Sequence, residues 1–143
     1  MIFNNSREED WMQEIYVQST QREEFIDLTD RVRDLIRENK WNNGGLILYC
    51  THTTAGITVN EAADPSVVRD ILTFWGRTIP RHGDYKHLEG NSDAHIKSSL
   101  MGCSQQMIVD QGKLVLGTWQ GIFFTEFDGP RSRRIKVQWI PVE

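Results

Sequence analysis

Apolar residues recur along this chain with two different periods, and together these predict a structure of both helices and strands. Helical spacing occurs in LTDRVRDLIREN (28–39), where Val32, Leu35 and Ile36 fall on one face. It occurs again over 65–76, where Asp64 and Pro65 have the residue types of an N-cap and a first helical residue. AHIKSSLMG (94–102) is expected to form a third, short helix.

Segments rich in β-branched and aromatic residues predict strands at both ends of the chain. The predicted strands cover 11–20, 24–29, 46–50, 51–61, 105–110, 113–117, 120–127 and 133–142. The motifs DQGK (110–113) and DGPRS (128–132) predict hairpin turns between neighbouring strands. Strands at both ends with helices between them favour the α+β class.

Length and composition set the broad class of protein. The 143 residues contain no repeat or linker, so we expect one domain over 1–143, with a loose polar lead-in over 1–10. The net charge of -4 argues against a general nucleic-acid binder. No apolar run is long enough to cross a membrane, and MIFNNSREEDW does not fit a signal peptide, so a cytoplasmic protein is expected. Cys50 and Cys103 match no zinc spacing and are expected to be buried, reduced thiols.

The segment THTTAGITVNE (51–61) combines an apolar face with a polar one. If it is one strand, alternation places His52, Thr54, Thr58 and Asn60 on one face, and Ile57 and Val59 on the other. Glu61 then lies at the strand exit, where a carboxylate can point into a cleft. The alternative is a solvent-exposed face followed by an acid that caps the next helix.

Histidines provide the main candidates for proton transfer or metal binding. His87 and His95 flank the end of a long loop over 77–93, and we expect them to converge with His52. Imidazole either carries protons near neutral pH or binds zinc, although these spacings match no known zinc motif. His82 is expected to be exposed to solvent.

Cationic and hydroxyl residues supply candidate anion ligands. His95 and Ser98 share one helical face, close to the free N–H groups of the helix start, although the serine also suits close packing. Alternation places Arg133 on the mainly apolar side of the last strand. Its guanidinium needs either Glu126, across the predicted DGPRS hairpin, or a bound anion.

Several motifs together resemble the YjbQ family, often called secondary thiamine-phosphate synthase enzymes. They are HTTAGITVNEAADPSV, DYKH, AHIKSSLMGCS, GTWQGI and GPRSRRI, and they occur in the family's order. The resemblance implies a single α+β domain of packed mixed or antiparallel β-sheets flanked by two or three helices. It also implies a homotrimer, in which sites can be built between subunits.

The resemblance also implies which residues form the site. The implied catalytic residues are His52, Glu61, His87 and His95. The implied substrate-binding residues are Asn60, Lys97, Ser98, Thr118, Trp119, Gln120, Arg133 and Arg134. Asp64 and Glu126 also match family motifs, whereas Phe127 stands where relatives place a histidine.

The activity implied by the resemblance joins a thiazole phosphate to a pyrimidine diphosphate and releases pyrophosphate. In that mechanism imidazoles surround the reacting centre, Arg133 and Lys97 hold the phosphates of a small phosphorylated molecule, and a divalent metal, Mg or Zn, can bridge them. One alternative is a zinc-dependent hydrolase with His52, His87 and His95 as ligands and Glu61 as base. Another is a non-catalytic trimeric binder of a phosphorylated metabolite.

Overall fold

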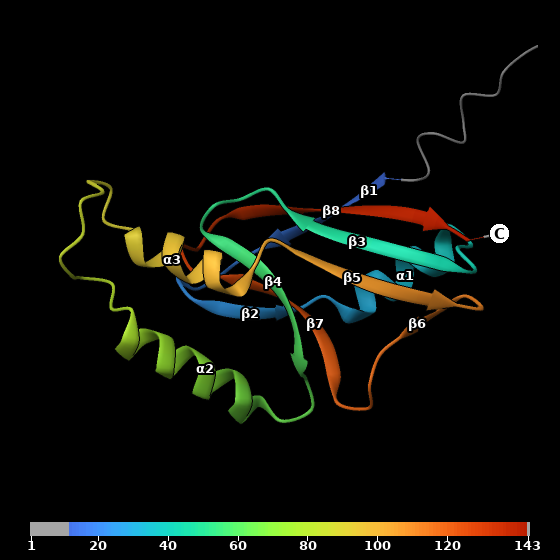
Figure 1. The fold of residues 1–143 in the computed structure, drawn as a ribbon, viewed down its shortest axis with the longest axis horizontal. Helices are drawn as coiled ribbons and strands as arrows, with labels where there is room; N and C mark the ends of the chain where they lie inside the picture. The colour runs from blue at the N-terminus through green and yellow to red at the C-terminus, as the bar shows by residue number, and fades with distance from the viewer. Residues whose placement is uncertain (1–11, 143) are drawn as a thin grey trace, which may run out of the picture.

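The computed structural model describes residues 12–142, where the chain forms eight strands and three helices (Figure 1). The expected lead-in over 1–10 lies outside these residues. Five strands form one antiparallel sheet in the order β1 (Met12–Gln18), β8 (Ser132–Pro141), β3 (Gly44–Cys50), β5 (Ser104–Asp110) and β6 (Lys113–Val115). Three form a second antiparallel sheet in the order β2 (Glu24–Asp27), β7 (Gln120–Glu126) and β4 (Ala55–Glu61).

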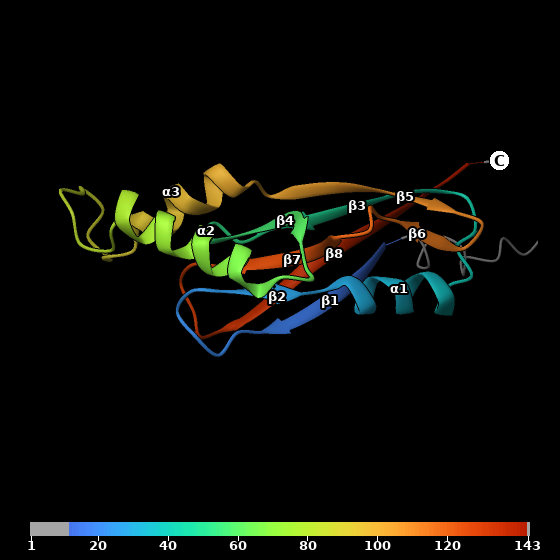
Figure 2. The ribbon, with the colours of Figure 1, turned by 90° about the horizontal axis from the view of Figure 1, so that it is seen from below.

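The core lies between the two sheets and α1 (Thr29–Glu38). The apolar face predicted for this helix is confirmed, because Val32 and Ile36 are buried against the sheets. Trp41, just after the helix, stacks on Trp139 of β8 with ring centroids 5.2 Å apart. Figure 2 shows α1 beside the strands of the smaller sheet, where both cover the inner face of the larger one.

The other two helices lie together at one end of the molecule (Figure 1). They are α2 (Pro65–Thr78) and α3 (Ser92–Met101), joined by the predicted long loop. Asp64 caps α2 as expected, with its carboxylate accepting hydrogen bonds from the N–H and hydroxyl of Ser66. In residues 12–142 no helix is long and apolar enough to span a membrane. The α+β class predicted from the sequence is confirmed.

Two predictions about local structure are wrong. Residues 51–61 do not form one strand: β3 ends at Cys50 in the larger sheet, the chain turns, and β4 begins at Ala55 in the smaller sheet. His52 therefore lies in a turn and shares no strand face with Asn60. DGPRS connects β7 to β8, which belong to different sheets, so it is a crossing between layers and not a hairpin. DQGK does join the paired strands β5 and β6.

The prediction for the two cysteines is half right. Cys50 is buried at the end of β3, whereas Cys103 is exposed just before β5. Alternation turns Cys103 toward the same side as the buried Met107 and Val109, but at this end the space between the sheets is open. Cys103 is therefore exposed despite its inward direction.

Candidate functional site

A polar hollow lies where the turn over 51–54 meets the start of α3 and the beginning of β8. Its volume is ≈ 320 Å³. We call it the histidine hollow, lined by Thr51, His52, Thr53, Thr54, Glu89, Asn91, His95, Asp128, Arg131 and Arg133. A larger hollow of ≈ 580 Å³ adjoins it and shares His52 and His95. We call this second space the cysteine hollow, because Cys50 and Cys103 line it.

A buried ion pair forms one wall of the histidine hollow. Nε of Arg133 donates to Oε1 of Glu126 at 2.9 Å, and Nη2 donates both to Oε2 and to Oγ1 of Thr54. Both side chains are almost completely buried, at 3% and 0% exposure. Burial opposes ionisation of Glu126, but the hydrogen bonds from Arg133 and Ser19 outweigh it and lower the pKa of this carboxyl. The Arg133–Glu126 pair considered from the sequence is therefore present, and it joins the two sheets.

His52 is held in one tautomer. Its Nε2 accepts a hydrogen bond of 2.9 Å from the backbone N–H of Arg134, so in the neutral ring the proton is on Nδ1. Burial and the nearby cation of Arg133 lower the pKa of His52. At neutral pH this imidazole is an uncharged hydrogen-bond donor on the hollow wall.

His95 lies across the hollow on the first turn of α3. Its ring packs edge-on against His87, with centroids 5.3 Å apart and an interplanar angle of 89°. The hydroxyl of Ser98 lies 2.6 Å from the carbonyl oxygen of Thr53 and ties the helix to the turn that carries His52. Ser98 therefore positions the two sides of the hollow relative to each other.

Lys97 lies in a separate ionic cluster. Its ammonium donates to Oε1 of Glu23 at 2.5 Å and to Oδ2 of Asp93 at 3.0 Å, and Arg22 bonds to Asp93 with both terminal nitrogens. Lys97 is 1% exposed. Burial opposes ionisation of Asp93, but hydrogen bonds from Arg22 and Lys97 lower its pKa overall. This cluster fastens α3 to the loop before β2 and does not line the histidine hollow.

The remaining sequence-predicted residues lie at the far end of β4. Asn60 and Glu61 end this strand, and Glu61 pairs with Gln120 at the start of β7. Glu61 lies six residue steps along the strand from Ala55, which is near His52, a span of about 20 Å at a rise of about 3.3 Å per residue. We call this group the β4-end group, and it comprises Asn60, Glu61, Thr118, Trp119 and Gln120. Within one chain it does not meet the histidines.

Arg134 contributes its backbone to the histidine hollow but not its side chain. Its guanidinium carbon lies 5.4 Å from the ring centroid of Tyr16, on the outward face of the larger sheet. Alternation along β8 explains this, because Arg133 faces inward and its neighbour must face outward.

The imidazoles do not fit a zinc ion held by His52, His87 and His95. Zinc binding through Nδ1 of His52 would put the proton on Nε2, opposite the N–H of Arg134. Nε2 itself already accepts that N–H. In residues 12–142, no three or more His, Cys, Asp or Glu side chains are grouped as metal ligands.

Sequence reasoning missed several residues of the hollow. Thr51 and Thr53 flank His52, Asn91 precedes α3, and Arg131 directly precedes β8. Asn91 donates to Asp128, which also bonds to Arg131. A usable signal was present, because the first residues of a helix and the GPRSRR motif were already candidates for anion binding.

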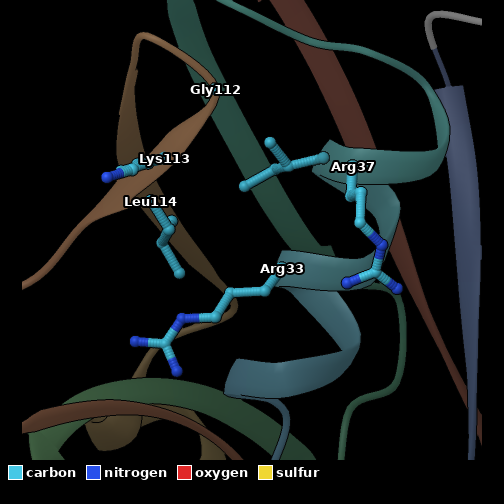
Figure 3. Close-up of a pocket in the computed structure, with 6 residues that line it drawn as sticks. Arg33, Arg37, Gly112, Lys113 and Leu114 are labelled. Carbon is cyan, nitrogen blue, oxygen red and sulfur yellow. The ribbon is translucent and has the colours of Figure 1, made fainter.

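A further hollow of ≈ 410 Å³ at the opposite end of the molecule is less suited to a ligand. Figure 3 shows that the cationic ends of Arg33, Arg37 and Lys113 point in different directions there. Arg33 and Arg37 are also paired along α1 with Asp30 and Asp34. No converging set of donors is therefore formed, and the histidine hollow remains the better candidate.

Comparison with known proteins agrees with the motifs. The model of the YjbQ-like UPF0047 protein family matches residues 13–142 of this chain. The UPF0047 protein of Methanocaldococcus jannaschii is 55% identical over 124 residues, which cover 87% of this chain and 90% of that protein. The UPF0047 protein YugU of Bacillus subtilis is 48% identical over 125 residues, covering 87% of this chain and 95% of the relative.

Solved structures show the same fold. A YjbQ/UPF0047 family protein from Clostridium acetobutylicum superposes with a TM-score of 0.87 at 54% identity, covering 90% of this chain and 99% of that one. A YbjQ-like protein from Sulfolobus solfataricus gives a TM-score of 0.87 at 33% identity, covering 92% and 97%. The two packed sheets with three helices are therefore shared with both proteins.

Proposed function

This chain belongs to the YjbQ-like UPF0047 family, and we propose that its histidine hollow binds the phosphate groups of a small molecule and catalyses transfer with loss of pyrophosphate. The proposed reaction is the thiamine-phosphate synthase reaction that the resemblance implies. The observation that carries the proposal is the placement of two imidazoles, His52 and His95, beside the buried guanidinium of Arg133 in one polar hollow.

His52 is suited to binding and not to proton transfer. Its lowered pKa keeps it uncharged at neutral pH, and its tautomer leaves Nδ1–H as a donor. A neutral donor can bond to a phosphate oxygen without losing its proton. We therefore assign His52 to orienting the substrate phosphate.

His95 is the proposed proton donor to the departing pyrophosphate. It lies at the start of α3, where the helix dipole favours an anion, and it is more accessible than the buried Arg133–Glu126 pair beside it. Negative charge develops on the leaving group, so a donor and cations already in position stabilise the transition state more than the ground state. Arg133 and Arg131 supply positive charge on the same wall.

A magnesium ion brought in with the phosphates would meet carboxylates at this hollow. Glu89 and Asp128 both line it, and carboxylate oxygens are ligands that Mg²⁺ prefers. The ion would neutralise charge between phosphate groups. This role requires no imidazole ligand, unlike the zinc-hydrolase alternative.

We propose that the chain assembles as the homotrimer the resemblance implies. Two surfaces support this: no residue of α2 is fully buried although the helix has an apolar side, and Tyr49, Ile108 and Ile140 are exposed on the outward face of the larger sheet. A neighbouring copy would cover such surfaces. It would also offer a route for the β4-end group, including Glu61, to approach a histidine hollow.

A direct assay of pyrophosphate release tests the proposed reaction. The purified protein is mixed with the pyrimidine diphosphate, the thiazole phosphate and Mg²⁺. We expect turnover that falls by about 10²- to 10⁴-fold in His95→Ala, the usual worth of a positioned proton donor. His82→Ala is the matched control, since that exposed loop histidine does not line the histidine hollow.

The outcomes separate the candidate functions. Pyrophosphate binding by calorimetry with no turnover would replace the transferase with a non-catalytic binder. Stoichiometric zinc in untagged protein, lost in His87→Ala, would favour the hydrolase. Equal turnover in wild type and His95→Ala would remove His95 from the mechanism.

A further inference from the structure

Cys50 and Cys103 lie directly opposite each other at the end of the larger sheet. The ladder between β3 and β5 pairs Tyr49 with Ser104, so the next position pairs the two cysteines. The N–H of Cys50 donates to the carbonyl oxygen of Cys103 at 2.7 Å, which shows that the pairing continues there. Opposite residues of such a hydrogen-bonded pair have Cα atoms about 5.5 Å apart, within the range of about 4.4–6.8 Å that a disulfide spans.

The two side chains also face the same space. Opposite residues of an antiparallel pair point to one side of the sheet, and both cysteines line the cysteine hollow. Cys50 is 2% exposed, whereas Cys103 is open to solvent. An oxidant in solution can therefore reach the Cys103 thiol, and the buried Cys50 thiol lies close enough to react with Cys103 afterwards.

We propose that Cys50 and Cys103 form a reversible disulfide when the protein meets a peroxide. The Cys103 thiol first releases its proton, and the thiolate attacks hydrogen peroxide, breaks its O–O bond and becomes a sulfenic acid. The hydroxide that leaves takes up the released proton and forms water. The sulfur of Cys50 then attacks the sulfenic sulfur, its proton leaves with the hydroxyl as a second water, and the S–S bond forms. The two thiols lose two electrons and the peroxide gains them.

The disulfide acts on the wall of the proposed site. Sγ of Cys50 now lies 3.6 Å from the carbonyl oxygen of Ala55 and 3.8 Å from that of His52. Bonding to Cys103 draws the sulfur away from the turn that carries His52. Oxidation therefore alters the histidine hollow. The effect on ligand binding there rests on the proposed function, whereas formation of the disulfide does not.

Peptide mapping of the full chain after peroxide treatment tests the disulfide. We expect a linked peptide containing Cys50 and Cys103, loss of both free thiols in each chain, and recovery of both with dithiothreitol. Cys103→Ser keeps the Cys50 thiol and forms no link, and Cys50→Ala keeps the Cys103 thiol. Because Cys103 is exposed, its variant tests the pairing even if the buried-site variant does not fold.

Two results would overturn the proposal. One is Cys103 oxidised to sulfinic acid or linked between chains while the Cys50 thiol stays free. The other is a stable sulfenic acid at Cys103 that the neighbouring thiol never resolves.

The effect on the histidine hollow is measured with inorganic pyrophosphate as the probe. We expect the oxidised chain to bind it at least about tenfold more weakly, which corresponds to about 1.4 kcal/mol. Equal affinity in both redox states would contradict the coupling. If the disulfide forms and neither state binds pyrophosphate, the proposed function fails while the cysteine pairing stands.

Discussion

The backbone N–H of Arg134 donates to Nε2 of His52 at 2.9 Å, and this bond takes the place of a sheet hydrogen bond. β3 ends at Cys50, opposite Ile135, so the N–H of Arg134 lies one residue beyond the last ladder pair. Beyond the last ladder pair β3 offers this N–H no carbonyl acceptor, and the imidazole supplies an acceptor instead. The end of β3 thus determines the tautomer of His52, through a backbone N–H that lies 82 residues away in the sequence.

We predict that His52 stays neutral with its proton on Nδ1, and that this makes stability sensitive to acid. Its pKa is lowered in the folded protein, so as pH falls below about 6.5 the unfolded chain takes up a proton before the folded chain does. The free energy of unfolding must then decrease with pH in that window. Nitrogen NMR shifts report the tautomer, and urea unfolding at pH 7.5 and 5.5 reports the stability.

The control for this prediction is a pair of glutamine substitutions. His52→Gln should show a smaller loss of stability between the two pH values than wild type, because the titrating group is gone. His82→Gln removes an exposed loop histidine and should leave the wild-type loss unchanged. A wild-type loss that persists in His52→Gln would assign the acid sensitivity to another group.

We predict that Glu126→Gln lowers the free energy of unfolding by about 3–5 kcal/mol, because it leaves the buried charge of Arg133 without its counter-charge. Since the pKa of Glu126 is lowered on folding, wild type also loses this contribution as pH falls below about 4.3 through the folded pKa. Asp34→Asn, which breaks an exposed pair with Arg37, should cost less than about 1 kcal/mol. Comparable urea midpoints for both variants would show that the buried pair contributes no more to the free energy of unfolding than the exposed pair does.

Sequence patterns were enough to predict the three helices, most of the strands and the α+β class. The apolar spacing of Val32 and Ile36 and the Asp64–Pro65 start both reflect local physics, and local physics is what a sequence pattern records. The prediction of one strand over 51–61 was wrong because alternation does not show where a chain leaves one sheet for another. That change of layer at 51–54 separates His52 from Asn60.

The candidate site was predictable by residue type but not by arrangement. His52, His87, His95 and Arg133 were expected to meet. His52, His95 and Arg133 line the histidine hollow, whereas His87 packs against His95 and is not part of its lining. Lys97 was also expected to bind phosphate because of its positive charge. Its position on α3 instead directs its ammonium toward Glu23 and Asp93. A sequence gives no direct information on which acid reaches which base when they are far apart along the chain.

We predict that Lys97→Met reduces stability but not pyrophosphate affinity. Loss of the ammonium leaves Glu23 and the buried Asp93 with less compensation, at a cost of about 3–5 kcal/mol. The histidine hollow is not lined by this residue, so calorimetry under folded conditions should give an affinity close to wild type. Arg133→Met is the comparison that should lose affinity. A Lys97→Met variant with wild-type stability and weakened binding would instead indicate that the Lys97 ammonium contacts the bound pyrophosphate.

The close approach of α3 to β4 gives the last prediction. A Cβ on Gly56 would lie 2.5 Å from the carbonyl oxygen of Gly102, which itself accepts the N–H of Ile57 at 3.0 Å. Gly56→Ala must push the end of α3 away, and overpacking of this kind costs about 1–3 kcal/mol. Gly76→Ala is the matched control: a Cβ there meets no atom within 4 Å, and alanine in a helix interior should stabilise by about 0.5–1 kcal/mol. We expect the urea midpoint to fall in Gly56→Ala and to rise in Gly76→Ala. Because α3 carries His95, only Gly56→Ala should also weaken pyrophosphate binding.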